Sequence, residues 1–478
     1  MSKILHENRN FIVKYLSMIE SIKFLYKFKQ NSINYLSKLM EEEIDIRRIS
    51  IRNRDLFLMN HPEIVETVLH KEYLIFEKTM KGVELAKGTS IVTSTGDKIR
   101  QKMHVARPKL SKSYFPGYLD KMKEIMQVEI ERLDMLTQNN KVINLHWELE
   151  YILLRLIGKI FFSKELDETH RILCYETHKG SIGLKRIALS VINFPKYIPS
   201  KANKEYLNAK QIADEFIKKL IDERISSTEQ HDDLLNDILN EIDEKGNPVP
   251  DEYKYNHLFT LLPASFETPA KALSFTINEI LRNEKIMSNL FDEFNQMGKY
   301  QTISVNDLEN ATYLHGCLKE ALRLYPPIWL QTRKNNEEVI IDNVHIPKGS
   351  IILMPQYMIH RDPKYWEHPN EFRPERFLQE KPLKHPFSFF PFGGGPSRCV
   401  GNQFAFQMIP LVIHNLLTEF DIQLLDKNKP IRIETGITMY PKDGLNVIMK
   451  RKLNDTLNNN KPNKGKDNKI ILEKEIIE

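Results

Sequence analysis

Cysteine is scarce in this chain, which has only three cysteines, Cys174, Cys317 and Cys399, among its 478 residues. They lie too far apart in the sequence to form a disulfide framework or a zinc cluster. This scarcity excludes small disulfide-stabilised folds and predicts a reducing, cytoplasmic environment. Each cysteine therefore needs its own explanation, either as a packed thiol or as a reactive one.

Long apolar runs and an excess of one charge are absent as well. No uncharged apolar stretch reaches the roughly 18 residues of a membrane-spanning helix, and the first residues do not have the layout of a secretory signal. We therefore expect no transmembrane anchor. The chain has 69 lysines and arginines against 64 aspartates and glutamates, so its charge gives no case for nucleic-acid binding.

The N-terminal segment, residues 1–36, is expected to be helical. From Phe11 to Leu36 it mixes aromatic and aliphatic residues with four lysines, Lys14, Lys23, Lys27 and Lys29. This composition fits an ordinary surface helix, and it also fits a basic helix that lies in a membrane interface. A peripheral contact with a membrane is therefore left open.

The remaining chain predicts a mainly α fold with a smaller β-rich part. Short strands are expected at residues 49–52 and 56–59, followed by a helix that Asn60 and Pro62 begin. Apolar residues recur at helical spacing between about residues 122 and 290. Helices are predicted at 144–162 and 204–225, a connector at 181–200, and further strands at 338–341 and 350–354.

With 41% hydrophobic residues, the chain can bury one large core. We assign that core to a single domain at residues 37–452. The end of the chain, residues 453–478, is rich in asparagine and lysine and has few apolar residues, so it is expected to be a disordered tail.

Glycines gather around the last cysteine, in the loop Phe392-Gly393-Gly394-Gly395-Pro396-Ser397-Arg398-Cys399-Val400-Gly401. Without Cβ atoms such a loop can adopt unusual backbone angles and press against a flat ring system. The helix expected after Cys399 offers free N–H groups and a dipole, and both stabilise a thiolate. We interpret Cys399 as the axial ligand of a haem iron, with a buried structural cysteine as the alternative.

The spacing Phe-x-x-Gly-x-x-x-Cys-x-Gly in this loop resembles the haem-binding signature of the cytochrome P-450 superfamily, and the resemblance, to the soluble bacterial type, covers most of the chain. It implies a single-domain P-450 fold with a long central helix over haem (Fe-protoporphyrin IX), with the iron on Cys399. The residues that it assigns to the haem site in this loop are Phe392, Gly393, Gly395, Arg398, Cys399 and Gly401.

Two further segments resemble the structural triad of that superfamily. Glu320 and Arg323 lie three residues apart on one helical face, just before a Leu-Tyr-Pro-Pro terminus. Arg376 lies in the later segment Phe372-Arg373-Pro374-Glu375-Arg376-Phe377. By this resemblance the three residues hold the scaffold on the haem side and take no chemical part in turnover.

The residues that would pair with the haem propionates depart from the usual pattern. Arg333 occupies a position at which family members place such an arginine. Two residues before the cysteine, however, Ser397 replaces the usual Arg or His, so either Arg398 turns inward or Arg333 carries more of the charge. In a third segment Ile99 and Met103 replace the usual Trp or His and Arg, and the candidate substitutes are Arg100, Lys102 and His104.

The segment Leu261 to Ala270 resembles the oxygen-activating part of the central helix. Glu267 and Thr268 match the acid and alcohol pair that relays protons to bound dioxygen, whereas Ser265 and Pro269 replace a glycine and a second hydroxyl residue. Pro269 cannot donate to the carbonyl of Ser265. We therefore hypothesise that the helix opens there and holds a water molecule beside Thr268.

The resemblance implies a monooxygenase that inserts one atom of O2 into an apolar small molecule, such as a lipid, fatty acid or terpenoid. No flavin or iron–sulfur domain is fused to the chain, so a ferredoxin or flavodoxin with its reductase is the expected electron donor. A peroxygenase or isomerase of the same fold, or a non-catalytic haem sensor, remains the alternative. The predicted substrate-pocket residues are Phe266, Ile328, Trp329 and Met439.

Overall fold

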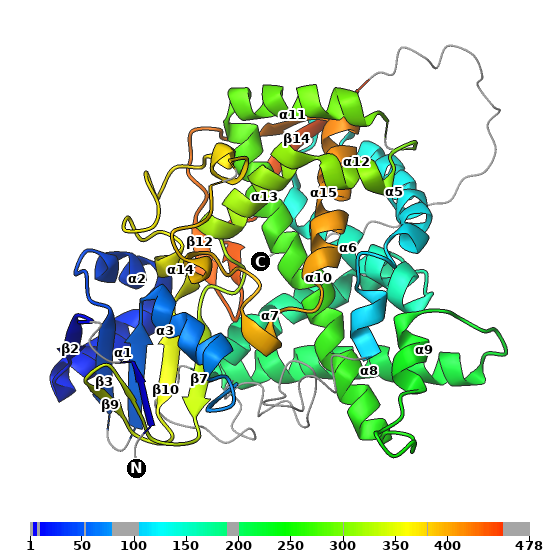
Figure 1. Ribbon diagram of the computed structural model, residues 1–478. Helices are drawn as coiled ribbons and strands as arrows, with labels where there is room; N and C mark the ends of the chain where they lie inside the picture. The colour runs from blue at the N-terminus through cyan, green and yellow to red at the C-terminus, as the bar shows by residue number, and fades with distance from the viewer. Residues whose placement is uncertain are drawn as a thin grey trace, which may run out of the picture.

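The computed structural model describes residues 3–6, 10–51, 54–78, 105–188, 200–299, 301–379 and 381–452. A β-rich part, which contains the N-terminal strands, lies beside a larger helical part (Figure 1). No helix within these residues is long and apolar enough to cross a membrane. The expected mainly α architecture with a smaller β-rich part is confirmed.

The helices are α1 (Met18–Gln30), α2 (Ser32–Met40), α3 (Pro62–Glu66), α5 (Pro116–Leu136), α6 (Leu145–Phe162), α7 (Arg171–Ala188), α8 (Lys201–Ser226), α9 (Leu234–Leu239), α10 (Asp251–Arg282), α11 (Glu284–Met297), α12 (Val305–Asn310), α13 (Thr312–Leu324), α14 (Gln356–Ile359) and α15 (Asn402–Glu419). The strands are β1 (Lys3–His6), β2 (Val13–Tyr15), β3 (Ile46–Ile51), β4 (Arg54–Met59), β5 (Phe76–Lys78), β6 (Ile143–Asn144), β7 (Gln331–Asn335), β8 (Val339–Ile341), β9 (Val344–Ile346), β10 (Ile351–Met354), β11 (Phe420–Leu424), β12 (Ile433–Thr435), β13 (Met439–Pro441) and β14 (Asn446–Arg451).

The largest sheet joins the two halves of the chain. Its strand order is β2-β3-β4-β10-β7-β5, and β10 runs parallel to β4 and antiparallel to β7. Smaller sheets are formed by β1-β8-β9, β11-β14-β6 and β12-β13. Because β5 and β7 are neighbours, residues near position 78 lie beside residues near position 333, which positions part of the candidate site.

Most of the predicted elements are present near their expected positions. Strands β3 and β4 and helices α6 and α8 match the predictions, as do β8 and β10. The helix after β4 begins at Pro62, but its N-cap is His61 rather than Asn60, because the ring nitrogen Nδ1 of His61 accepts the N–H of Glu63 at 3.3 Å.

The N-terminal segment is only partly helical, which differs from the expectation for residues 1–36. Strands β1 and β2 pair in parallel with β8 and β3, so this segment belongs to the sheets of the main body. A capping box at Ser17 begins α1, and the side chain of Asn31 caps α2 and separates the two helices. The secondary structure of the first residues is thus set by pairing with distant strands, although the composition of the segment suggested a single helix.

Helix α10 spans 32 residues and crosses the middle of the helical part, where it packs on α6, α13 and α15 (Figure 1). It is the long central helix that the fold prediction required. Two of the predicted segments are not fully covered: α7 continues to Ala188 inside the expected connector, and the rest of the connector and the tail at 453–478 lie outside the described residues.

Candidate active site

The loop before α15 holds Cys399 in a fixed conformation. The N–H of Cys399 donates to the carbonyl of Phe392 at 2.9 Å. Gly393 and Gly395 have φ angles of 74° and 62°, in the region that favours glycine. A Cβ on Gly395 would lie 1.9 Å from the carbonyl oxygen of Leu69, so no other residue fits at this position.

The beginning of this loop is tied to the segment after β10. The N–H of Phe390 donates to the ring nitrogen Nε2 of His360 at 3.0 Å, and the amide of Gln356 donates to the carbonyl of Phe390 at 2.5 Å. Burial lowers the pKa of His360 to about 3, so its imidazole is neutral and can accept this hydrogen bond. The loop is therefore anchored on both sides of its glycines.

Cys399 differs from the other two cysteines because its side chain is exposed, whereas Cys174 and Cys317 are buried. The surrounding atoms still desolvate it: burial raises the pKa of the Cys399 thiol, against the lowering effects of the Gly401 N–H, Lys78 and Arg398. The thiol is therefore accessible at its surface, yet enough protein atoms lie around it to disfavour its charged form.

Two cations lie beside the cysteine loop, Arg333 through its contact with Ser397 and Lys78 through its charge interaction with Cys399. Arg333 in β7 is buried and donates to the hydroxyl of Ser397 at 3.0 Å and to the carbonyl of Thr332 at 2.8 Å. Lys78 is its neighbour across the strands β5 and β7. Neither cation forms an ion pair with a carboxylate in the part of the chain that the structure describes, so the two side chains offer positive charge to an anionic group.

Desolvation makes this pair of cations electrostatically costly. Burial lowers the pKa of Lys78 to about 7, and the charge of Arg333 adds to that lowering, while Cys399 opposes it. Burial alone lowers the pKa of Arg333 to about 10. Haem fits these residues, because its propionates would compensate the cations and its iron would accept the thiolate.

The face of α10 that carries Thr268 is open, as the predicted role of this residue requires. The Thr268 hydroxyl donates to the carbonyl of Ala264 at 2.9 Å, and Ala264, one turn earlier, is exposed. The helix continues through Pro269 without interruption. The helix therefore does not open at Pro269. Because proline has no N–H, the only local effect is that the Ser265 carbonyl receives no hydrogen bond from position 269.

Glu267 lies in a buried ionic cluster that the sequence analysis missed. Its carboxylate pairs with the Lys271 ammonium one turn later on α10, and the hydroxyl of Thr438 donates to the same carboxylate at 2.9 Å. Lys271 also donates to the Thr438 hydroxyl at 2.5 Å, and its side chain is fully buried. A lysine four residues after Glu267, within an otherwise apolar helical run, was the signal for this pair.

Three further titratable side chains surround this ion pair. Burial raises the pKa of Glu150 to about 8, with Lys271 opposing and Glu267 adding to the rise. Burial also lowers the pKa of His178 to about 3 and that of His146 well below its ordinary value. His146 is held by Ser274, whose hydroxyl oxygen lies 2.8 Å from its Nδ1. At neutral pH, the ion pair is thus enclosed by a protonated acid and two uncharged imidazoles.

The predicted structural triad is assembled in the structure. Arg323 donates to both carboxylate oxygens of Glu320, at 2.8 and 2.7 Å, and Arg376 donates to one of them at 3.1 Å. Glu320 and Arg323 are completely buried. Arg323 also donates to the carbonyls of His360 at 2.9 Å, Pro369 at 2.6 Å and Glu371 at 3.1 Å, which ties α13 to the segments that precede the cysteine loop.

Three of the four predicted substrate-pocket residues are core residues instead. Phe266 is fully buried and lies two positions from both Ala264 and Thr268, on the opposite side of α10. Trp329 packs on Phe28, with ring centroids 5.8 Å apart, and belongs to the same buried cluster as Met439. Apolar residues that line a pocket and those that fill a core look alike in a sequence, which explains these errors.

The fourth pocket residue, Ile328, is half-buried. The segment with Ile99, Arg100, Lys102, Met103 and His104 lies outside the described residues.

Of the two arginines considered for the haem propionates, the structure favours Arg333. Arg398 is exposed, whereas Arg333 is buried and contacts Ser397, which replaces the usual cation. Lys78, which sequence reasoning missed, gave no local signal because only strand pairing places it beside Arg333.

Known proteins provide a separate comparison. The model of the family described as "Cytochrome P450" matches residues 15–448. Cytokinin hydroxylase of Arabidopsis thaliana is 26% identical over 410 residues, which cover 82% of this chain and 78% of the relative. Human cytochrome P450 4V2 is 25% identical, with 82% of this chain and 79% of the relative covered. The putative cytochrome P450 132 of Mycobacterium tuberculosis is 23% identical, with 85% and 90% covered.

The family model spans most of the chain, including the loop of Cys399, the open face of α10 and the triad. Members of this family bind haem through a cysteine thiolate. The chain belongs to the cytochrome P450 family and is a haem-thiolate monooxygenase.

Proposed function

We propose that this enzyme inserts one oxygen atom from O2 into an apolar small molecule, such as a lipid, fatty acid or terpenoid, and that Cys399 holds its haem iron. The observation that supports this assignment best is the exposed thiol of Cys399 near the buried Arg333 and the partly buried Lys78, two cations that pair with no carboxylate in the described part of the chain. When bound, haem supplies the activation of dioxygen.

The loop residues would hold the flat face and the edge of the haem. Phe392 and the glycines Gly393, Gly395 and Gly401 permit a close approach beside the thiolate, and the N–H of Gly401 donates to the sulfur. Arg333 and Lys78 would bind the propionates. We assign this role to Arg333 rather than to the exposed Arg398, since Arg333 is already buried and oriented by Ser397.

Thr268 and Glu267 would divide the handling of protons. The Thr268 hydroxyl lies on the open face of α10 and, by turning away from the Ala264 carbonyl, can donate a proton into the site. Glu267 is held by Lys271 and Thr438, and Glu150 beside them carries a proton at neutral pH because its pKa is raised to about 8. The cluster thus keeps a proton on Glu150, near the carboxylate of Glu267, which precedes Thr268 in the chain.

Replacing Lys271 with methionine is expected to destabilise the protein by about 3–5 kcal/mol, because the Glu267 carboxylate would remain buried without its cation. Urea unfolding of the haem-loaded protein at pH 7 measures this effect. The double variant with Glu267→Gln should recover most of the loss. Lys210→Met is the matched control, since it removes the lysine of a partly exposed i,i+4 pair with Asp214 and should cost below about 1 kcal/mol. Equal losses for the two lysines would contradict the buried pair.

Electrons would come from a separate ferredoxin or flavodoxin with its reductase, and the enzyme would work in the cytoplasm. Arg398 is exposed next to the ligand cysteine, so an acidic partner can approach the thiolate side of the haem there. The three free cysteines agree with a reducing compartment. The hydroxylase name of the Arabidopsis thaliana relative supports hydroxylation as the reaction.

Spectroscopy of the purified, haem-loaded protein tests the proposal. The reduced carbonyl adduct should absorb at the red-shifted position of thiolate-bound haem, and apolar compounds should displace the water on the iron and shift its spin state. A globin-like carbonyl spectrum would refute thiolate ligation. Turnover with peroxide alone would identify a peroxygenase, and spin shifts without any NADPH oxidation in the presence of redox partners would identify a sensor.

A further inference from the structure

Helix α1 carries apolar side chains on two opposite sides. Its inner side is buried through Ser21, Phe24 and Phe28, and these phenylalanines pack in the cluster of Leu36 and Trp329. Its other side carries Met18, Ile19, Ile22 and Tyr26, whose side chains are 66%, 67%, 51% and 63% exposed. We refer to these four residues as the outer face of α1.

The outer face of α1 is a patch and not a set of scattered residues. Its members follow the spacing i, i+1, i+4 and i+8, which places them on one side of a helix. Tyr15 at the end of β2 and Ile12 just before that strand are exposed as well, by 56% and 48%. Contiguous apolar surface of this kind marks an interaction site in a soluble or peripheral protein.

Lysines border the outer face of α1. Lys23 and Lys29 lie on the same helix and form no ion pair with any residue in the described ranges, and Lys27 contacts the ring of Tyr35 at 5.8 Å. The one acidic residue of the helix, Glu20, is already engaged, because its carboxylate accepts the N–H of Ser17 at 2.8 Å. Lys14 on β2 pairs with Glu42 at 3.0 Å. The border of the patch is therefore positively charged.

We propose that the outer face of α1 docks on the surface of an anionic lipid bilayer. Its four apolar side chains would enter the headgroup region while Lys23 and Lys29 extend toward lipid phosphates. A second copy of this chain fits less well, because a symmetric contact would bring the lysines of both copies together with only Glu20 to compensate. The proposal is independent of the haem chemistry.

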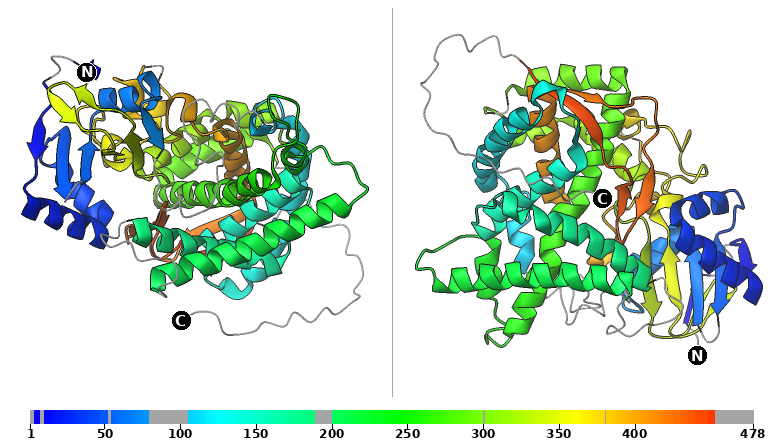
Figure 2. Two further views of the ribbon diagram at one scale, coloured as in Figure 1. Left: turned by 90° about the horizontal axis from the view of Figure 1, so that it is seen from below. Right: turned by 180° about the vertical axis from the view of Figure 1, so that it is seen from behind.

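Helix α1 is already fixed in the orientation that docking requires. Phe24 and Phe28 fix the inner side of α1, and β2 joins the preceding residues to the main sheet through β3. Figure 2 shows α1, the darkest blue of the helices, at the outer edge of the β-rich part in both views. Docking would thus need no refolding of the helix, and the membrane would meet the edge of the molecule that lies away from α10.

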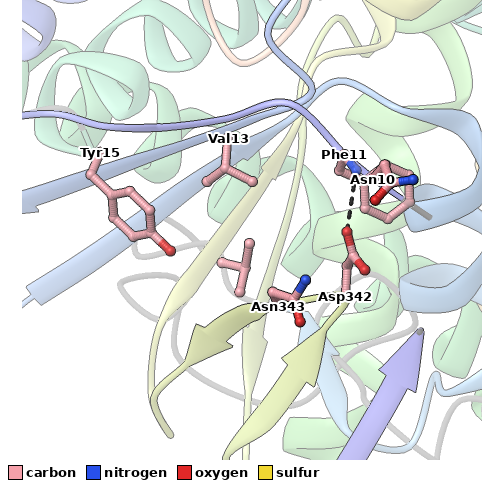
Figure 3. A pocket seen from close by; sticks show the side chains of 7 residues that line it. Asn10, Phe11, Val13, Tyr15, Asp342 and Asn343 are labelled. Carbon is pink, nitrogen blue, oxygen red and sulfur yellow. Dashed lines mark hydrogen bonds between the residues drawn. The ribbon is translucent and has the colours of Figure 1, made fainter. Parts of the chain in front are cut away.

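A pocket of about 390 Å³ at β2, the strand before α1, is not the phosphate site. It is lined by Asn10, Phe11, Val13, Tyr15, Asp342, Asn343 and Val344 (Figure 3). Asp342 accepts the N–H of Phe11 at 3.2 Å, so the charged group of this pocket is an anion. A lipid phosphate would be repelled there, and the lysines of α1 remain the groups that attract it.

Sedimentation of the haem-loaded protein with vesicles tests this inference. We expect binding to phosphatidylcholine vesicles that contain about one third phosphatidylserine, weaker binding to pure phosphatidylcholine, and a decrease with salt. Ile19→Ser with Ile22→Ser should weaken the binding at least about tenfold. Lys23→Gln and Lys29→Gln should each weaken it about fivefold. Ile225→Ser, at a position 72% exposed on α8, is the control and should leave it unchanged.

Three results would overturn the inference. The first is no binding to the anionic vesicles, and the second is binding that survives the change of Ile19 and Ile22. The third is a concentration-dependent dimer that the same double variant dissociates, since a second copy would then cover the outer face of α1. The carbonyl spectrum of each variant, which should match that of the wild-type protein, shows that the fold and the haem site are intact. A failure here would therefore be distinguishable from a failure of the proposed function.

Discussion

Replacement of Cys399 with serine is expected to abolish the thiolate-type carbonyl spectrum and to reduce monooxygenase activity below detection. A serine hydroxyl has nearly the size of the thiol, but it is neutral at physiological pH and is a poor donor to iron. The loop itself should persist, because its anchors are backbone contacts: the N–H of Cys399 to Phe392, and the close approach of Gly395 to Leu69. The experiment therefore removes the ligand and leaves the scaffold in place.

The two other cysteines are the matched controls for this experiment. Cys174 and Cys317 are buried, and burial raises the pKa of each thiol well above its ordinary value. Alanine at either position should lower stability through a small cavity, by about 1 kcal/mol, and leave the carbonyl spectrum unchanged. A thiolate-type spectrum in the Cys399→Ser protein, or its loss in the Cys317→Ala protein, would show that the ligand had been assigned to the wrong cysteine.

The sequence was sufficient for those parts of the site that short segments build. The glycines around Cys399 are needed by local geometry, since Gly393 and Gly395 adopt positive φ angles and Gly395 leaves no space for a Cβ. Glu320 and Arg323 meet because they lie one turn apart on α13. Requirements of this kind are visible as residue types at fixed spacing, and they do not depend on how distant elements pack.

The parts that depend on tertiary pairing could not be predicted in the same way. Lys78 lies near Cys399 only because β5 pairs with β7, and Thr438 reaches Glu267 from the turn before β13. Nothing in the sequence around Lys78 or Thr438 indicates these contacts. Trp329 shows the opposite error, because a large apolar side chain near the site was assigned to the pocket although the N-terminal helix α1 covers it.

The N-terminal segment combines both situations. Its apolar and basic composition correctly indicated a helix with a basic surface, and the capping residues Ser17 and Asn31 explain where the two helices begin. The strand β2 was missed because its pairing partner β3 lies about thirty residues later in the chain. Local propensity is a weak guide for so short a strand.

Replacement of Arg323 with methionine is expected to cost about 3–5 kcal/mol in the free energy of unfolding. Arg323 donates five hydrogen bonds, two to the Glu320 carboxylate and three to backbone carbonyls, and both side chains are completely buried. The variant would leave the buried carboxylate to Arg376 and to the N–H of Arg373, which contact the same oxygen of Glu320 at 3.1 and 3.0 Å. Its other oxygen would lose its partner, as would the three carbonyls.

Arg376→Met is the matched control, because Arg376 makes a single hydrogen bond to Glu320 and one to the carbonyl of His368, and it is partly accessible to water. Its loss should cost about 1–2 kcal/mol. Urea unfolding of the haem-loaded variants at one pH compares the two changes, and the carbonyl spectrum of the folded fraction should remain of the thiolate type in both. Equal losses in the free energy of unfolding for the two variants would refute the conclusion that Arg323 contributes most of the stability of the triad. An altered carbonyl spectrum in the folded Arg323→Met protein would instead show that the triad controls the iron ligand directly and does more than hold the scaffold behind the loop.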